Sequence, residues 1–312
     1  MKELMLSIIV PTYNHEKYIK KALESILMQK TKYSYEVLVG EDASTDNTRN
    51  VIKQYEKEHP GKITVFYRQQ NLSKSKYSNS ADLRRRAKGK YIITLEGDDF
   101  WTSDEKIEKQ INFLEGHPDY VAIAHNCVVV DENDNPNGDI YPECKVEEYT
   151  FKQYLCGIYP GQLATMLCRN FMIQDIFDKT ILEKNLSPGD KLIYFGLLTS
   201  GKIYCMQEQM SAYRHIRKGG SSYSANYKYD FKKDENWYSE LLQLAYVQKH
   251  IEGINCAETL YLGCLIHGLK KKQLSIRYFI QYKRNIKNFI NAFYGYIERM
   301  YAIHISKKGR AN

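Results

Sequence analysis

The chain has 312 residues, of which 43% are hydrophobic and 26% charged, so it can bury a core and is not an intrinsically disordered chain. Its formal net charge is +8, but residues 264–312 hold eleven Lys and Arg against one Glu, a surplus of ten that leaves about −2 for residues 1–263. A basic tail on a near-neutral body predicts contact with an anionic surface.

The seven cysteines favour a reducing, cytoplasmic environment. Their number is odd, no pair has CxxC spacing, and Cys168 lies in an apolar run, which argues against a disulfide framework or a zinc site. The first residues lack the apolar segment of a signal peptide, and no apolar run reaches the roughly 18 residues of a membrane span. We therefore expect a cytoplasmic protein.

Strands and helices alternate over the first hundred residues. The expected elements are a strand at 6–10, a helix at 15–28, a strand at 37–39, a helix at 46–58, a strand at 63–67, a helix at 79–87 and a strand at 91–95. This βαβαβαβ order predicts a mostly parallel α/β sheet with helices on its faces.

The rest of the chain is less regular and ends in helices. The expected elements are a helix at 104–115, a strand at 121–130, a turn-rich segment at 131–139, mixed short elements at 150–215, and helices at 231–250, 256–270 and 273–304. We find no internal repeat and no low-complexity linker.

Carboxylates follow two of the predicted strands. Glu41 and Asp42 come after the second strand, and Glu96, Asp98 and Asp99 come after the fourth. Ligands of parallel α/β sheets bind at the carboxyl ends of the strands, so these residues predict a site.

Two interpretations of each acidic segment remain open from the residues alone. Three carboxylates within four residues repel one another unless a cation lies among them, and Mg²⁺ or Mn²⁺ prefers such oxygen ligands, with Gly97 giving room for the turn. Alternatively, residues 96–99 are a polar loop before the next helix. Asp42 likewise belongs either to a site or to a capping segment in which Ser44 or Asp46 caps a helix.

Three segments carry a family resemblance: SIIVPTYN at residues 7–14, EDASTD at 41–46 and GKYIITLEGDDFW at 89–101. In their order and spacing they resemble the family 2 glycosyltransferases of the GT-A fold, above all bacterial enzymes that build capsular and other surface polysaccharides. The resemblance covers residues 5–105 and continues more weakly to about residue 225. It implies a GT-A, Rossmann-like sheet flanked by helices.

The resemblance implies a nucleotide-sugar site. Its expected residues are Pro11 and Tyr13 at the base, Asp42 accepting from the base N–H, Asn79 near the nucleotide, Glu96 near the ribose, Gly97 in the turn, and Asp98 as ligand of a Mn²⁺ or Mg²⁺ ion, with Asp99 as a further ligand. The family usually has Asp where this chain has Glu96, and the longer side chain leaves its contact open.

Two further residues receive roles from the resemblance. Asp190, in Pro188-Gly-Asp-Lys-Leu192, corresponds to a general base that takes the acceptor proton; the alternative is an N-capping Asp. His215 corresponds to a histidine that completes the metal site, although it stands one place earlier than in the commonest pattern. The alternative for His215 is a surface histidine beside a basic loop.

Three residues are expected at the acceptor or in a closing loop: Thr165, Arg214 and Lys218. Thr165 is equally compatible with a simple strand residue. Arg214 and Lys218 would pair with the donor diphosphate. In the tail, basic residues interleaved with aromatic and aliphatic ones form either an amphipathic helix suited to anionic lipid or a packed helix with a charged outer face.

These observations predict a GT-A domain at residues 1–228 and a helical, basic C-terminal extension at 229–312. Within the domain, the nucleotide-binding half would span about 1–105 and the acceptor half about 106–228. The expected activity is inverting transfer of a sugar from a UDP-sugar to a hydroxyl of a growing surface glycan of capsule, exopolysaccharide or lipopolysaccharide type, with a glycan or lipid-linked glycan as acceptor.

Two alternatives stand beside this expectation. One is a nucleotidyltransferase, which would carry a glycine-rich, basic loop after the first strand, where this chain has Pro11-Thr-Tyr-Asn14. The other is a non-catalytic nucleotide-sugar-binding scaffold of a polysaccharide assembly complex. We expect no nucleic-acid partner, leave homo-oligomerisation open, and expect a cytoplasmic protein with a peripheral location at the inner membrane face as the further option.

Overall fold

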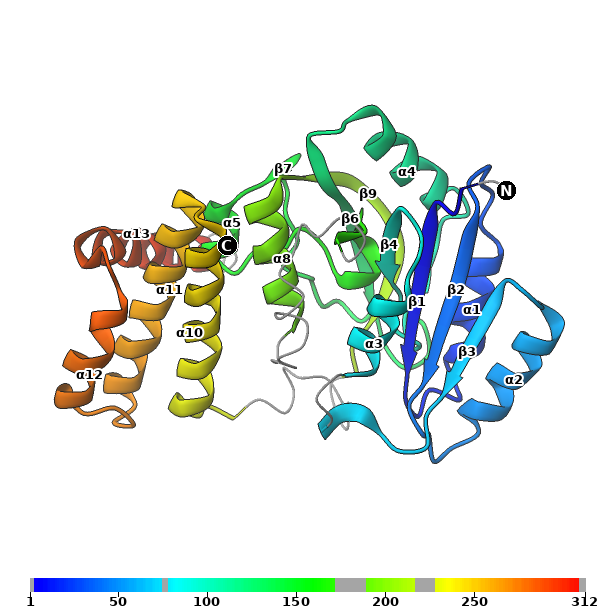
Figure 1. Cartoon of the computed structure of the whole chain (residues 1–312), viewed down its shortest axis with the longest axis horizontal. Helices are drawn as coiled ribbons and strands as arrows, with labels where there is room; N and C mark the ends of the chain where they lie inside the picture. The colour runs from blue at the N-terminus through cyan, green and yellow to red at the C-terminus, as the bar shows by residue number, and fades with distance from the viewer. Residues whose placement is uncertain (1–2, 75–77, 172–188, 217–227, 309–312) are drawn as a thin grey trace. The chain divides into compact units, whose positions relative to one another are not determined.

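A computed structural model of the chain describes residues 3–74, 78–171, 189–216 and 228–308 (Figure 1). The chain divides into two compact units. The first comprises residues 1–149, 159–185 and 200–222, and the second comprises residues 150–158, 186–199 and 223–312. The domain boundary at residue 228 that we expect from the sequence stays a prediction.

The described part of the first unit holds a nine-stranded mixed sheet. In spatial order its strands are β3 (Ile63–Tyr67), β2 (Tyr35–Glu41), β1 (Leu6–Thr12), β4 (Tyr91–Thr94), β8 (Leu167–Arg169), β6 (Tyr120–Val130), β9 (Lys202–Arg214) and β5 (Phe100–Trp101), with β7 (Glu148–Tyr149) paired to β9. The first four are parallel to one another, as Figure 1 shows. Strand β8 is antiparallel to β4 and β6, whereas β6 and β9 are parallel.

Helices cover both faces of the parallel strands, as the sequence pattern predicts. Alternate residues of β1, such as Ile8 and Val10, share one apolar core with residues of α1 (Ile19–Leu27), α2 (Thr48–Glu58) and α4 (Lys106–Gly116). Helix α3 (Asn79–Arg86) contacts β1 and β2 and lies outside that core. Because both faces are covered, the strand ends are where polar groups of the sheet can meet a ligand.

Two parts of the chain differ from the expectation. The expected short elements at 150–215 include the thirteen-residue strand β9, whose apolar alternation is interrupted by the exposed Gln207 and Glu208. The single helix expected at 273–304 is wrong: α12 (Ile276–Tyr282) and α13 (Phe289–Lys308) are separated by a 3₁₀ turn, η3 (Lys283–Asn285).

The described part of the second unit is helical and holds α5 (Phe151–Leu155), α8 (Gly189–Ser200), α10 (Phe231–Gln248), α11 (Ile251–Lys270), α12 and α13. The buried Glu258 of α11 explains where α13 begins. Its Oε1 accepts from the backbone N–H groups of Lys287 (2.8 Å) and Asn288 (3.2 Å), so it satisfies donors that a continuous helix would have used internally.

None of the described helices combines the length and the apolar character that crossing a bilayer requires.

Candidate functional site

The acidic segments lie on either side of the carboxyl end of β1. Strand β1 runs between β2 and β4, and Thr12 pairs with Glu41. The backbone N–H of Asp42 donates to the carbonyl of Thr12 (3.0 Å), and that of Gly97 donates to the carbonyl of Pro11 (3.1 Å). The structure thus brings the two segments to one edge of the sheet.

The loops after β1 and β2 are joined to each other. The N–H of Asn14 donates to Ser44 Oγ (3.0 Å), and the N–H of Thr45 donates to Asn14 Oδ1 (2.8 Å). Asn14 and Ala43 both have left-handed backbone conformations, with φ of 57° and 58°. Non-glycine residues adopt this conformation at some cost, so the reciprocal bonds hold both loops in a strained shape.

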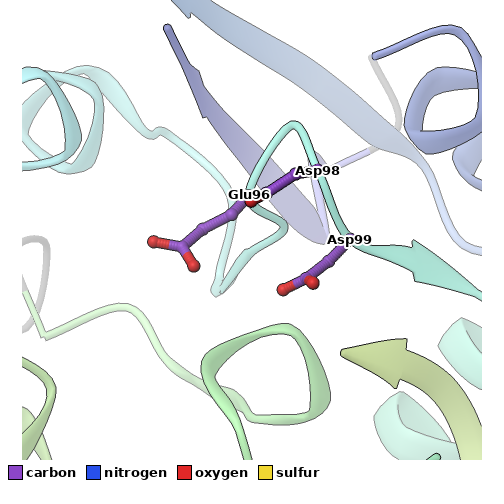
Figure 2. A group of neighbouring side chains, drawn as sticks. All are labelled: Glu96, Asp98 and Asp99. Atoms are coloured by element: carbon purple, nitrogen blue, oxygen red, sulfur yellow. The ribbon is translucent and has the colours of Figure 1, made fainter. Parts of the chain in front are cut away.

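The segment between β4 and β5 carries Glu96, Asp98 and Asp99 (Figure 2). One carboxylate oxygen from each of the three lies within 4.8 Å of the others. Asp99 is 2% exposed, whereas Glu96 and Asp98 are partly exposed. Like charges this close repel one another, so a divalent cation among these oxygens would lower the electrostatic free energy.

Asp99 is held on both carboxylate oxygens. Oδ1 accepts from the backbone N–H of Arg214 and Oδ2 accepts from Gln162 Nε2, each at 2.8 Å. Burial, followed by the neighbouring charges of Asp98 and Glu96, raises the pKa of Asp99 well above its usual range despite the bond from Arg214. Asp99 therefore ties the acidic segment to β9 and to the 162–165 turn.

Arg214 is used inside the protein. Its Nε donates to the carbonyl of Asp98 (2.9 Å), its Nη1 donates to the carbonyl of Asp131 (2.6 Å), and its Nη2 pairs with Asp134 (2.5 Å). Its side chain is 1% exposed and lies over the ring of Tyr18. In this conformation Arg214 fixes the backbone at Asp98 and its guanidinium is not exposed to a diphosphate. Its contact with a donor diphosphate stays a prediction.

Asp98 is the more accessible aspartate of the segment, with 29% of its side chain exposed. His15 Nε2 lies 3.8 Å from Asp98 Oδ2, and His15 Nδ1 lies 3.2 Å from Thr12 Oγ1. A side chain at Gly97 would place Cβ 2.5 Å from Thr12 Oγ1 and 2.8 Å from His15 Nδ1. Glycine is therefore required so that the acidic segment can pass close to the end of β1.

The two acids at the end of β2 have different environments. Glu41 is fully buried and pairs with Arg49 Nη2 (2.5 Å), and it also accepts from the backbone N–H of Ser44 (2.6 Å). Asp42 Oδ1 accepts from the N–H of Leu72 (2.9 Å). Burial raises the pKa of Asp42, although this bond and the charge of Arg68 oppose the shift.

Of the other expected nucleotide contacts, Tyr13 is 42% exposed and Pro11 is half-buried. Asn79 is buried, donates from Nδ2 to the carbonyl of Gly40 (2.7 Å) and accepts from Arg68 Nε (3.2 Å). In this structure the amide of Asn79 thus supports the end of β2, and its contact with a nucleotide stays a prediction.

His215 follows the end of β9. Its Nδ1 lies 2.8 Å from Asp139 Oδ2, its ring stacks on Tyr213, and it is not a member of the acidic group formed by residues 96, 98 and 99. Its role as a metal ligand stays a prediction. Lys218 lies outside the described residues.

Thr165 and Asp190 lie in different units. Thr165 ends the 3₁₀ turn η2 (Leu163–Thr165), is fully buried and donates to the carbonyl of Gln162 (2.6 Å), so it holds the turn, and its contact with an acceptor stays a prediction. Asp190 is in the first turn of α8, where Oδ1 accepts from the N–H of Lys191 (2.8 Å). Burial raises the pKa of Asp190 against the opposing effect of Lys191.

The sequence did not single out His15 or Gln162. His15 directly follows the PTYN segment, and its place after a strand end was the available signal. Gln162, Asp131 and Asp134 carried no comparable signal, because their contacts with Asp99 and Arg214 join residues 63 to 83 positions apart.

The chain matches a known protein family. The family model described as glycosyl transferase family 2 matches residues 7–177. An uncharacterized protein of Mycobacterium tuberculosis is 28% identical over 214 residues, which is 69% of this chain and 60% of that protein. The putative teichuronic acid biosynthesis glycosyltransferase TuaG of Bacillus subtilis is 37% identical over 110 residues, which is 35% of this chain and 42% of TuaG.

The chain thus spans about 60% of the length of the first of these curated relatives. Among solved structures, that of S. aureus TarS residues 1–349 with UDP-GlcNAc has a TM-score of 0.62 at 19% identity, over 92% of this chain and 81% of that one. At this identity the likeness shows the fold alone, and it confirms the expected GT-A-like architecture with C-terminal helices.

Proposed function

The chain belongs to glycosyl transferase family 2, and we propose that it transfers a sugar from a UDP-sugar, with inversion, to a hydroxyl group of a growing surface glycan. The observation that carries the proposal is the placement of Asp42 and the Glu96–Asp99 segment on the two sides of the end of β1, fixed by bonds to Thr12 and Pro11. A nucleotide at this edge would have its base near one acidic segment and its diphosphate near the other.

The base would lie at the ends of β1 and β2. Tyr13 offers an exposed ring on which uracil can stack, and Asp42 offers a carboxylate that can accept from the base N–H. Glu96 would be near the ribose. S. aureus TarS was solved with UDP-GlcNAc and with UDP, which supports a UDP-sugar as donor here.

The acidic segment suits a divalent cation of the Mn²⁺ or Mg²⁺ type. Its three carboxylates are hard oxygen donors, and their ligand atoms lie within 4.8 Å of one another. Asp98 would be the main ligand because Asp99 already bonds Gln162 and Arg214 on both oxygens. His215 is proposed as a further ligand. Such a cation offsets the negative charge that develops on a departing diphosphate.

We assign Asp190 as the base that accepts the proton of the acceptor hydroxyl. The oxygen then attacks the anomeric carbon from the face opposite the diphosphate, so the C–O bond to the acceptor forms as the bond to UDP breaks. The raised pKa of Asp190 is consistent with a proton-accepting role, since a base is most effective when its pKa approaches the working pH.

The acceptor is proposed to be a glycan or lipid-linked glycan. Two Bacillus subtilis relatives support a surface polysaccharide: TuaG, named for teichuronic acid biosynthesis, and GgaB, named for minor teichoic acid biosynthesis. All seven cysteines are free, which supports a cytoplasmic, reducing location. A peripheral contact with the inner membrane face through the C-terminal helices belongs to the same proposal.

The test is a screen of UDP-sugars in the presence and absence of Mn²⁺, read as UDP release and as thermal stabilisation. We expect one donor to raise the melting temperature and to release UDP only with the metal. If no nucleotide-sugar produces either response, the proposed function is wrong. Donor stabilisation without any turnover on a panel of glycan acceptors would instead favour the scaffold alternative.

Asp190→Asn separates binding from chemistry. Donor stabilisation should be unchanged, while the transfer rate falls by roughly 10²–10⁴ because the positioned base is lost. Glu252→Gln, which changes an exposed acid in the first turn of α11, is the matched control and should keep near-normal transfer. A near-normal rate in Asp190→Asn would place the base elsewhere.

A further inference from the structure

Helix α13 packs against the protein mainly through small residues and exposes large apolar side chains to solvent, which reverses the usual arrangement of an amphipathic helix. On the inner face Ala292 is fully buried, and a Cβ at Gly295 would lie 2.5 Å from Thr259 Oγ1 of α11. The helix is thus seated closely on α11 through small residues. The ring of Tyr296 also lies against Gly263 of α11, while most of the other large apolar side chains are exposed.

The outward apolar residues form one continuous face, which we call the α13 stripe. It consists of Ile290, Phe293, Tyr294, Ile297, Met300 and Tyr301, whose side chains are between 42% and 68% exposed. Their spacing of three and four residues places them along one side of the helix. Single exposed apolar residues are ordinary in proteins, but a face of this kind marks an interaction surface.

Basic residues border the α13 stripe at its N-terminal end. Lys283 Nζ lies 5.5 Å from the ring centroid of Phe289, which begins the helix, and Arg284 and Lys287 are exposed in the same connection. Residues 270–299 contain eight Lys and Arg and one acidic residue, Glu298. The N-terminal end of the apolar face is therefore bordered by exposed positive charge.

We propose that the α13 stripe inserts into the interfacial region of an anionic phospholipid bilayer while Lys283, Arg284 and Lys287 contact its headgroups. Aromatic and aliphatic side chains on one helix face with basic residues beside them match the chemistry of such an interface. Two copies of this chain meeting through the stripe would bring the same positive charges together, which argues against a self-association surface. The inference rests on the proposed membrane contact but not on sugar transfer.

The experiment is sedimentation of the 312-residue chain with vesicles, without donor or acceptor. We expect binding to vesicles of phosphatidylglycerol and phosphatidylcholine, weak binding to pure phosphatidylcholine, and a decrease with salt, because headgroup attraction is screened. Equal binding to both vesicle types, or no binding to the anionic ones, overturns the proposal. Because UDP release is measured separately, a chain that turns over its donor but ignores vesicles refutes only this inference.

Paired variants assign the surface. Phe293→Asp with Ile297→Asp should weaken partitioning by at least about 100-fold, since two apolar side chains would no longer leave water. The matched control, Val247→Asp with Ile251→Asp, alters two exposed apolar residues of the same unit that lie outside the stripe and should bind as the unchanged chain does. Equal losses in both pairs would overturn the assignment. Phe293→Leu with Ile297→Leu should retain binding, which separates loss of apolar character from misfolding.

The basic residues are tested separately. Lys283→Ser with Arg284→Ser should weaken binding to anionic vesicles by roughly 30-fold, at about a factor of five or six for each charge removed. Lys228→Ser with Lys232→Ser removes the same charge from exposed positions of the same unit and should change binding much less. If the Val247/Ile251 and Lys228/Lys232 controls lose as much as the test pairs, general positive charge or unfolding explains the binding and the stripe does not. Self-association abolished by the stripe variant, with no vesicle binding, would assign the face to a second copy.

Discussion

At the end of β2 the buried Glu41 is paired with the cation of Arg49, whereas at the end of β4 the equally buried Asp99 accepts from neutral donors, the Gln162 amide and the Arg214 N–H. In both places one acid holds the loop, and its neighbour is the one that we propose as a donor or metal contact. Asp42 accompanies Glu41, and Asp98 accompanies Asp99. An acidic segment at a strand end therefore contains residues of two kinds, which the sequence alone presents as equivalent.

The difference between the two holding acids lies in how burial is compensated. The negative charge of Glu41 is matched by Arg49 at contact distance. Asp99 has only partial compensation, and burial with the nearby charges of Asp98 and Glu96 raises its pKa. A positive ion beside Asp98 would relieve this repulsion, so the β4 end is the one that is incomplete by itself.

The largest expected effect is at Asp98. Asp98→Asn should lower UDP-sugar transfer by on the order of 10³-fold, as expected when a group that stabilises developing charge is removed. Stability should change little because this side chain is partly exposed. Transfer rates across a Mn²⁺ titration, together with urea unfolding, measure both. A comparable loss of transfer in a folded Asp99→Asn chain would contradict the distinction between Asp98 as the metal ligand and Asp99 as the acid that holds the segment.

A buried pair should be costly to break at Glu41. Glu41→Gln leaves Arg49 without its anionic partner and should lower the free energy of unfolding by about 2–3 kcal/mol, below the range for fully buried pairs because Arg49 is 37% exposed. Urea denaturation gives this value directly. Glu36→Gln changes a partly exposed acid on the same strand and is the control. An effect below that of the control would mean that Arg49 does not compensate the buried charge.

Asp99→Asn should cost less than Glu41→Gln. An amide can keep one of the two bonds but presents its NH₂ group to the other donor, so an unsatisfied buried donor remains, worth about 1–3 kcal/mol in the free energy of unfolding. The neutral amide also removes the repulsion from Asp98 and Glu96, which offsets part of this cost. The same denaturation measurement applies. If Asp99→Asn were the more destabilising change, cationic compensation would not explain the difference between the two strand ends.

The smallest effect concerns Asp134, which holds Arg214 and hence the backbone of Asp98. Burial alone would raise its pKa, but the bonds from Lys21 and Arg214 outweigh this and lower it. The ionised Asp134 carboxylate therefore stabilises the folded chain fully at pH values above its ordinary pKa of 3.8. This stabilisation is lost as the pH falls through the lower pKa that Asp134 has in the folded state.

Asp134→Asn should accordingly destabilise the chain by about 1–2 kcal/mol at pH 7, because Arg214 is 1% exposed but keeps its bonds to the carbonyls of Asp98 and Asp131, and by progressively less as the pH drops below 4. Thermal unfolding at several pH values checks this. If the stability difference between Asp134→Asn and the unchanged chain stayed constant with pH, the charge of Asp134 would not be its cause.

Local pattern was sufficient for the parallel half of the sheet. The apolar runs at β1 and β4 and the helical spacing between them predicted strands whose order then placed Asp42 and Asp98 at one edge. Spacing predicts which residues come near a strand end, because the backbone alone decides that. Spacing cannot predict which of two adjacent acids forms hydrogen bonds or ion pairs within the protein.

That second question depends on partners far along the chain. Arg214 was expected at a diphosphate, but Asp131 and Asp134 take its guanidinium, and nothing near Arg214 in the sequence announces them. The break before α13 had the same origin, because the capping group, Glu258, lies on α11, 29 residues before Lys287. Thr165, by contrast, is held by the carbonyl of Gln162, only three residues earlier.

The joined loops after β1 and β2 have a consequence for engineering. Asn14 supplies both an acceptor and a donor to the partner loop, and both loops contain a residue in the left-handed conformation. Grafting only one of these loops from another enzyme would therefore break the hydrogen bonds that hold the two loops together. An attempt to change donor preference should exchange residues 13–16 and 42–48 as a single cassette.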